Sequence, residues 1–336
     1  MKTMKCWITG LLCAAIASIG LPPGETCAAP FFTATRHPLI GLYGLPASED
    51  AAIRNKGAVD LRLTTDWANT YFASANAQES LILDVESLRV TLSARYGIGH
   101  GAVVGIDIPW LVIGGGILDG VIDSCHEAFG LRSGGRESAP RNRLLAFYRR
   151  DGITRLHAGS SSTGIGDVRL TGGWQLLENS GGHNVRLALF GSLKLPTGDA
   201  SALSGSGSTD LAVWLSSASG LPIPYGRWRA FGEAGLIVMT RGKILPDQQR
   251  PLAGFGTLGF GFAPADWIDF KIQANAHTSF YSESEFKQLN AISIQSTMGA
   301  TLIWSDKTTL DIGLTEDVIV DTSPDIVLHL SLRHTF

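Results

Sequence analysis

Side chains that suit a metal ion occur together in the segment 114–163. Asp119, Asp123, His126 and Glu127 fall on one side of an expected short helix. Asp123 and Glu127 are four residues apart, and His126 lies between them. Oxygen ligands at that spacing suit a hard divalent cation. Arginines follow in the same segment, among them Arg132, Arg136, Arg141, Arg143, Arg149 and Arg150. Ion pairs with these arginines, or a solvated helix face, explain the acids without a metal, so we predict no metal site and no cofactor.

Charged residues also recur at alternate positions along many segments, where they would share one face of a β-strand. The acids in this pattern are Asp60, Asp66, Asp84, Glu86, Asp107, Asp167, Asp210, Glu233, Asp269 and Asp311. The bases are Arg62, Arg89, Arg95, Arg169, Arg186, Lys194, Arg229, Lys271 and Arg333. A strongly ion-selective pore would show one dominant sign, whereas these signs nearly balance. If this face lines the lumen of a barrel, the balance indicates cross-strand ion pairs around a narrow or gated interior.

The elements that carry these charges are twelve segments in which apolar and polar side chains alternate with a period of two. In "NVRLALFGSLKLP", for example, Leu187, Leu189 and Leu193 share one face. Each segment has around ten residues or more, which suits a tilted strand that crosses a bilayer. Short turns alternate with longer polar connections, as in bacterial outer-membrane proteins. We therefore predict an all-β fold, a transmembrane antiparallel β-barrel of about twelve strands over residues 58–336; a soluble β-sandwich is the alternative.

The longest connection is the insertion over residues 114–163, which we expect on the extracellular side. Its apolar residues recur at four-residue intervals: Ile117, Val121, Cys125 and Phe129. This spacing predicts a short amphipathic helix in the loop, either exposed or folded into the lumen.

The second strand contains a change of phase. Leu81, Leu83 and Val85 are apolar at odd positions, and the apolar residues that follow, from Leu88 onward, occupy even positions. A shift of one residue moves every side chain to the opposite face of a sheet. We therefore predict a β-bulge near Glu86 and Ser87.

The N-terminus has the pattern of a secretory signal peptide. Lys2 and Lys5 precede an apolar run from Trp7 to Leu21, and "ETCAAP" then offers small residues for cleavage. The run is about 15 residues, shorter than the roughly 20 that a membrane helix needs, so a retained anchor is the less favoured alternative. We predict a cleaved signal peptide over 1–29 and a periplasmic segment over 30–57. The net charge of −3 argues against a nucleic-acid partner.

The last strand, within "SPDIVLHLSLRHTF", alternates to the final residue. Its apolar face carries Leu328, Leu330, Leu332 and Phe336, and only His334 interrupts the row. This ending resembles the C-terminal signature that the barrel-assembly machinery reads in outer-membrane proteins. The resemblance implies a place in the Gram-negative outer membrane, with membrane lipid and lipopolysaccharide around the barrel. It also implies that Phe336 belongs to an assembly signal.

Four motifs carry a second resemblance: "GGGILDGVIDSCHEAFGLRSGGRESAP", "HPLIGLYGLPA", "STGIGDVRL" and "LKLPTGD". With them the chain resembles the domain-of-unknown-function family 3187, a group of uncharacterised Gram-negative envelope proteins. The likeness extends over nearly the whole mature chain. No activity is assigned to that family, so the resemblance implies a location and not a function.

A third resemblance concerns "NAHTSFY". His277 and Ser279, with Asn290 further on, are similar to the His, Ser and Asn of outer-membrane phospholipase A, which implies lipid-active esterase chemistry. Here the alternation places His277 and Ser279 on the lumen face, away from any phospholipid, and Asn290 follows at a different spacing. We therefore predict no enzyme activity. The expected function is a conduit or binding barrel for a small solute; the alternative is a structural or interaction barrel with a filled lumen and a partner-binding loop.

Overall fold

The computed structural model describes residues 29–116, 140–179, 185–221, 223, 226–319 and 322–336. Within these ranges the chain forms fifteen strands: β1 (Val59–Ala75), β2 (Glu79–Gly99), β3 (Ala102–Gly114), β4 (Leu145–Arg150), β5 (Ile153–Ala158), β6 (Ser162–Ile165), β7 (Arg169–Asn179), β8 (Val185–Lys194), β9 (Asp210–Leu221), β10 (Arg227–Met239), β11 (Leu252–Ala265), β12 (Ile268–His277), β13 (Ser293–Ile303), β14 (Thr308–Asp317) and β15 (Ile326–Thr335). One short helix, α3 (Lys287–Asn290), lies between β12 and β13. No helix in these ranges is long and apolar enough to cross a membrane.

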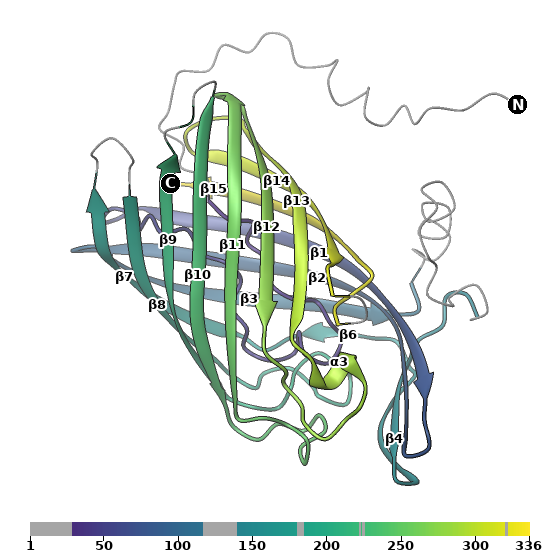
Figure 1. Cartoon of the computed structure of the whole chain (residues 1–336). Helices are drawn as coiled ribbons and strands as arrows, with labels where there is room; N and C mark the ends of the chain where they lie inside the picture. Colours follow the sequence, from purple (N-terminus) through teal and green to yellow (C-terminus); the bar gives the residue numbers. More distant parts are fainter. Residues whose placement is uncertain (1–28, 117–139, 180–184, 222, 224–225, 320–321) are drawn as a thin grey trace, which may run out of the picture.

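All fifteen strands belong to one antiparallel sheet that closes on itself (Figure 1). Closure comes from the pairing of β1 with β15, in register from Asp60↔Thr335 to Asn69↔Ile326. The strands β4, β5 and β6 branch from β2 and β3, and the other twelve form the ring. Every ring strand therefore has two hydrogen-bonded neighbours, which a bilayer requires. The prediction of a twelve-stranded antiparallel barrel is confirmed.

The two faces of the ring differ in polarity as the alternation predicts. On β9, Leu211, Val213 and Leu215 point outward and are about half exposed, whereas Asp210 and Trp214 point inward and are buried. The same division holds on the neighbouring strands. An outward apolar band and a polar interior are the arrangement of a membrane barrel, in which lipid is the outer solvent.

The short turns gather at one end of the ring. β2 and β3 are joined by a two-residue turn in which His100 and Gly101 have φ of 54° and 71°, the backbone of a type I′ hairpin. The chain also ends here, where the Phe336 N–H donates to the Val59 carbonyl at 2.9 Å. Short turns face the periplasm in outer-membrane barrels. We therefore name this the periplasmic end, and the end with the long connections the extracellular end.

Strand β2 has no bulge at Glu86 and Ser87, so that prediction is wrong. The β1–β2 register runs from Val59↔Tyr96 to Ala75↔Ser80 without a shift. Leu81 and the apolar residues at the next two odd positions point into the lumen, where they join an apolar core at the extracellular end. The apolar residues of β2 move from the inner to the outer face because the side chains that fill the lumen differ along the strand. The backbone of the strand stays regular.

The insertion adds strands at the extracellular ends of β2 and β3. β4 pairs with the extracellular part of β2, β5 pairs with β4, and β6 pairs with β3. The β4–β5 hairpin and the ends of β1 and β2 extend beyond the barrel (Figure 1). The helix expected over 117–129 lies outside the described residues.

Residues 29–53, here named the luminal segment, lie inside the barrel, where the purple start of the chain runs between the strands (Figure 1). This corrects the periplasmic position expected for residues 30–57, of which only the last few are exposed at the periplasmic end. Phe31 and Leu39 are completely buried. The stretch "HPLIGLYGLPA" has no Lys, Arg, Asp or Glu, and burial removes its apolar side chains from water.

The end of β15 supports a prediction about assembly. Deletion of Phe336 is expected to lower the amount of protein in the outer membrane severalfold, while the melting temperature of refolded protein in detergent stays nearly unchanged. The ring is already paired without this side chain, which is 64% exposed and packs on His334 at 4.4 Å between ring centroids. Leu330→Ala, a similar apolar loss on the same lipid-facing row, is the control and should leave abundance normal. Normal abundance of the Phe336 deletion would show that the residue carries no assembly signal.

Candidate functional site

The luminal segment spans the length of the lumen twice. Its start lies near the periplasmic end, where the Ala29 carbonyl accepts from Lys271 Nζ at 3.0 Å. It reaches the extracellular end at Gly44, whose N–H donates to Asp210 Oδ2 at 2.7 Å. It then returns, and the N–H of Gly57, a few residues after its end, donates to the Gly97 carbonyl near the periplasmic end of β2. Both ends of the segment are therefore at the periplasmic end, and its apex closes the extracellular end.

The wall leaves room for the segment because many lumen-facing side chains are short. Buried examples are Thr64, Thr91, Ser93, Thr171, Ala188, Ser192, Ala212, Ser216, Ala218, Thr257, Thr297, Thr315 and Ser331. In a narrower barrel the side chains of the wall can fill the interior by themselves. Here the wall alone would enclose a wide polar space, and the segment occupies it.

Neutral hydrogen bonds join the two arms of the segment to β11 and β12. Gln273 Oε1 accepts from the Phe31 N–H at 2.8 Å. Ser48 Oγ lies 2.9 Å from Thr257 Oγ1, and Asn275 Nδ2 donates to both hydroxyl oxygens. Water can replace each of these partners, so the interface resembles a solvated protein surface more than an apolar core.

Ion pairs join the segment to β1 and β2. Arg95 of β2 binds Glu49 of the segment at 2.5 Å and Asp107 of β3 at 2.8 Å. Arg36 of the segment binds Asp66 of β1 at 2.6 Å. The charges of the segment thus complete a network that the wall residues alone leave unfinished.

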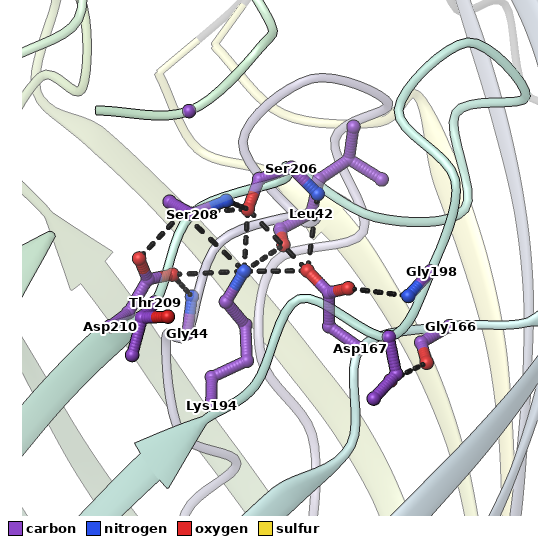
Figure 2. Close-up of polar contacts among 12 residues, drawn as sticks. Leu42, Gly44, Gly166, Asp167, Lys194, Gly198, Ser206, Ser208, Thr209 and Asp210 are labelled. Atoms are coloured by element: carbon purple, nitrogen blue, oxygen red, sulfur yellow. Dashed lines mark hydrogen bonds and ion pairs between the residues drawn. The ribbon is translucent and has the colours of Figure 1, made fainter. Parts of the chain in front are cut away.

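A buried polar cluster lies at the apex of the segment (Figure 2). Lys194 Nζ contacts Asp167 at 2.5 Å, Asp210 at 3.2 Å and Ser206 Oγ at 2.5 Å. With Ser208 we name these residues the Lys194 cluster. Its ammonium also lies 3.5 Å from the Leu42 carbonyl, and Asp210 accepts the Gly44 N–H. The cluster is buried, and it holds the apex of the segment to Lys194 of β8 and Asp210 of β9.

Apolar contacts seal the extracellular end above this cluster. Tyr43 of the segment packs against Phe280 and Tyr281, with ring centroids 5.4 and 6.1 Å apart. Leu39 joins the same core, with residues from three extracellular connections. Burial raises the pKa of the Tyr281 hydroxyl well above its ordinary value, so this group stays neutral.

The structure places most of the predicted lumen-facing residues where the sequence indicates. The residues that point into the lumen are Asp107, Lys194, Arg229, Glu233, Asp269, Lys271, His277 and Arg333. Arg186 lies near the periplasmic end of β8 and pairs with Glu178 at 3.2 Å. The sequence analysis did not identify Arg36 and Glu49 as residues of the lumen. The feature that could have revealed them is the apolar, nearly uncharged stretch between them.

Asp84 and Glu86 are the exceptions, because they lie on the outer face of β2. Asp84 pairs with Arg143 of the insertion at 2.8 Å. Glu86 accepts from the Trp67 indole N–H at 2.7 Å. Both acids stay buried because the insertion covers this part of the wall, so their charges meet protein instead of lipid.

The esterase residues do not meet. His277 Nδ1 lies 2.9 Å from the Thr278 carbonyl, and Asn290 bonds to the Ser284 carbonyl. No hydrogen bond among the described residues joins His277 to Ser279 or Asn290. The same part of the chain contains no group of three His, Cys, Asp or Glu side chains that could hold a metal ion. The acids from Asp119 to Glu127 lie outside it.

Comparison with known proteins places the fold. Residues 6–336 match the family described as "Protein of unknown function (DUF3187)". The COG4313 outer membrane channel from Pseudomonas putida F1 has a TM-score of 0.53 and 14% identity, over 85% of this chain and 98% of that one. The transport unit of the autotransporter AIDA-I from Escherichia coli has a TM-score of 0.45 and 10% identity, over 86% and 93%. The KdgM porin in complex with disordered oligogalacturonate has a TM-score of 0.40 and 7% identity, over 83% of this chain and 99% of that one.

The first of these similarities establishes an outer-membrane barrel fold, and the two lower scores add nothing to it. No curated protein matches the chain.

Proposed function

Because the chain belongs to the family described as "Protein of unknown function (DUF3187)" and folds as an outer-membrane β-barrel, we propose that it is a conduit for a small solute, which the luminal segment keeps closed. The observation that carries this proposal is that the wall of the barrel does not depend on the segment that fills it. The ring is complete through its own ladder hydrogen bonds, and its short lumen side chains would leave an aqueous space if the segment moved out.

The route of the segment supports a gate. Both of its ends lie at the periplasmic end, so the apex can withdraw toward the periplasm without passing through the wall. Its contacts with β1, β2, β11 and β12 include ion pairs and hydrogen bonds, whose partners water can replace. Release therefore does not require the barrel to unfold.

The proposal includes a location and partners. We place the protein in the Gram-negative outer membrane, after export through a signal peptide over residues 1–29. Its exposed apolar band contacts membrane lipid and lipopolysaccharide, and the C-terminal strand is read by the barrel-assembly machinery. No enzyme activity is part of this proposal.

The second candidate is a structural or interaction barrel whose insertion binds a partner. The observation that favours it is the β4–β5 hairpin, which extends beyond the ring and leaves β5 as an edge strand. An exposed edge offers unpaired backbone groups to another chain. In this alternative the luminal segment never leaves, and the barrel conducts nothing.

A disulfide across the gate tests the proposal. Ser48→Cys with Thr257→Cys, in a Cys125→Ser background, should form a disulfide, because the two hydroxyl oxygens are 2.9 Å apart. We expect the oxidised protein to show no openings in planar bilayers and the reduced protein to show openings like those of the background protein. Ser48→Cys alone is the control for the oxidant. Equal conductance of the oxidised and reduced forms would contradict gating by the segment.

A further inference from the structure

A small cavity lies between the luminal segment and the wall formed by β1, β2, β3 and β7. Three guanidinium groups line it: Arg36 of the segment, Arg89 of β2 and Arg169 of β7. Hydroxyl groups of Thr35, Thr64 and Thr91 share its lining. Its volume is about 40 Å³. That space holds roughly two or three water molecules, or one small oxyanion.

The lining of the cavity carries three guanidinium groups against two carboxylates. The carboxylates are Asp107, which pairs with Arg95, and Asp167, which pairs with Lys194. Glu49 and Asp210 contact the same two cations from outside the lining. In the described chain, no carboxylate oxygen lies within 4.0 Å of a guanidinium nitrogen of Arg89 or Arg169. Arg89 and Arg169 therefore line the cavity without a carboxylate in direct contact.

Arg89 and Arg169 instead donate to backbone carbonyls of the segment. Arg89 Nη2 lies 3.1 Å from the Gly41 oxygen, and Arg169 Nη2 lies 2.6 Å from the Leu45 oxygen. Arg169 Nε is buried and has no hydrogen-bond partner. A carbonyl has only a partial negative charge, so it balances a buried guanidinium incompletely.

We infer that this cavity binds a small oxyanion of the carboxylate or phosphate type, and that the conduit passes small anionic solutes. The inference rests on the proposed function and names its solute class. A guanidinium presents its N–H groups as a planar fork, which matches the two oxygens of a carboxylate or phosphate. The lumen as a whole is nearly balanced in charge, so selectivity comes from this local cluster.

The same contacts link the solute to the gate. Arg89 and Arg169 each hold one carbonyl near the apex of the segment. A charged oxyanion is a stronger acceptor than a carbonyl, so a bound anion competes for these donors. Entry of the solute thereby weakens the attachment of the segment to β2 and β7.

The test uses the full-length protein in detergent with two probes, inorganic phosphate and acetate, against chloride at equal ionic strength. We expect both oxyanions to raise the melting temperature, because they bind the folded state. Arg89→Gln and Arg169→Gln should each weaken the affinity about tenfold or more. Arg227→Gln, which breaks an exposed pair with Asp266 at a periplasmic turn, should leave the affinity unchanged.

Two results would overturn the inference: equal effects of the oxyanions and chloride on the intact protein, or unchanged affinity in both glutamine variants. If a glutamine variant does not fold, Arg89→Lys and Arg169→Lys keep the charge and lose the planar fork, and affinity equal to that of the intact protein would overturn the inference. Reversal potentials in a salt gradient separate the two proposals. Conductance without anion preference removes only the solute class, whereas no conductance from any variant removes the conduit.

Discussion

Deletion of residues 30–53 is expected to raise the conductance of the barrel in planar bilayers by about tenfold or more, because an empty barrel of this width forms an aqueous channel. The deletion removes every ion pair between the segment and the wall, including those of Arg36 and Glu49. It leaves the ladder between β1 and β15 intact. The remaining wall presents short polar side chains to the lumen, which water can solvate.

A second deletion, of residues 117–139, is close in length and leaves the luminal segment in place, so its conductance should stay near that of the intact protein. A difference in gel migration between unheated and heated samples checks that both variants fold. A folded 30–53 deletion with the low conductance of the intact protein would contradict the conduit and favour the structural barrel.

Lys194→Met is expected to lower the free energy of unfolding by about 3–5 kcal/mol, because it leaves two buried carboxylates without their cation. The side chains of Asp167 and Asp210 are 4% and 0% exposed. Urea titration of the protein in detergent measures the change. The variant should also open more often in bilayers, since the apex of the segment loses the contact between its Leu42 carbonyl and the Lys194 ammonium of β8.

A triple variant without the buried charges is the control for this prediction. Lys194→Met combined with Asp167→Asn and Asp210→Asn removes the uncompensated charges and should recover most of the stability. The exposed pair of Arg227 and Asp266 is expected to contribute at most about 1 kcal/mol, so Arg227→Met should change little. Normal stability of Lys194→Met would mean that the cluster does not hold the apex.

The sequence by itself determined the barrel. Each ring strand has water or protein on one side and lipid on the other, so a period of two appears within every strand, as in Leu211, Val213 and Leu215 of β9. The number of strands and the closure of β1 on β15 follow from this local pattern, because a membrane admits no unpaired edge. Most lumen-facing charges were readable for the same reason.

Only the tertiary structure decided what fills the lumen. The bond between Ser48 and Thr257 joins residues 209 positions apart, and no local pattern encodes such a contact. The faces of β2 show the consequence: Leu83 points inward because the apex of the luminal segment makes the interior apolar there, and Asp84 points outward because Arg143 covers it. The polarity of the side chains along a strand depends on what each face contacts. Where a face contacts residues 29–53 or the insertion, its neighbour is a part of the chain that is distant in sequence and not solvent.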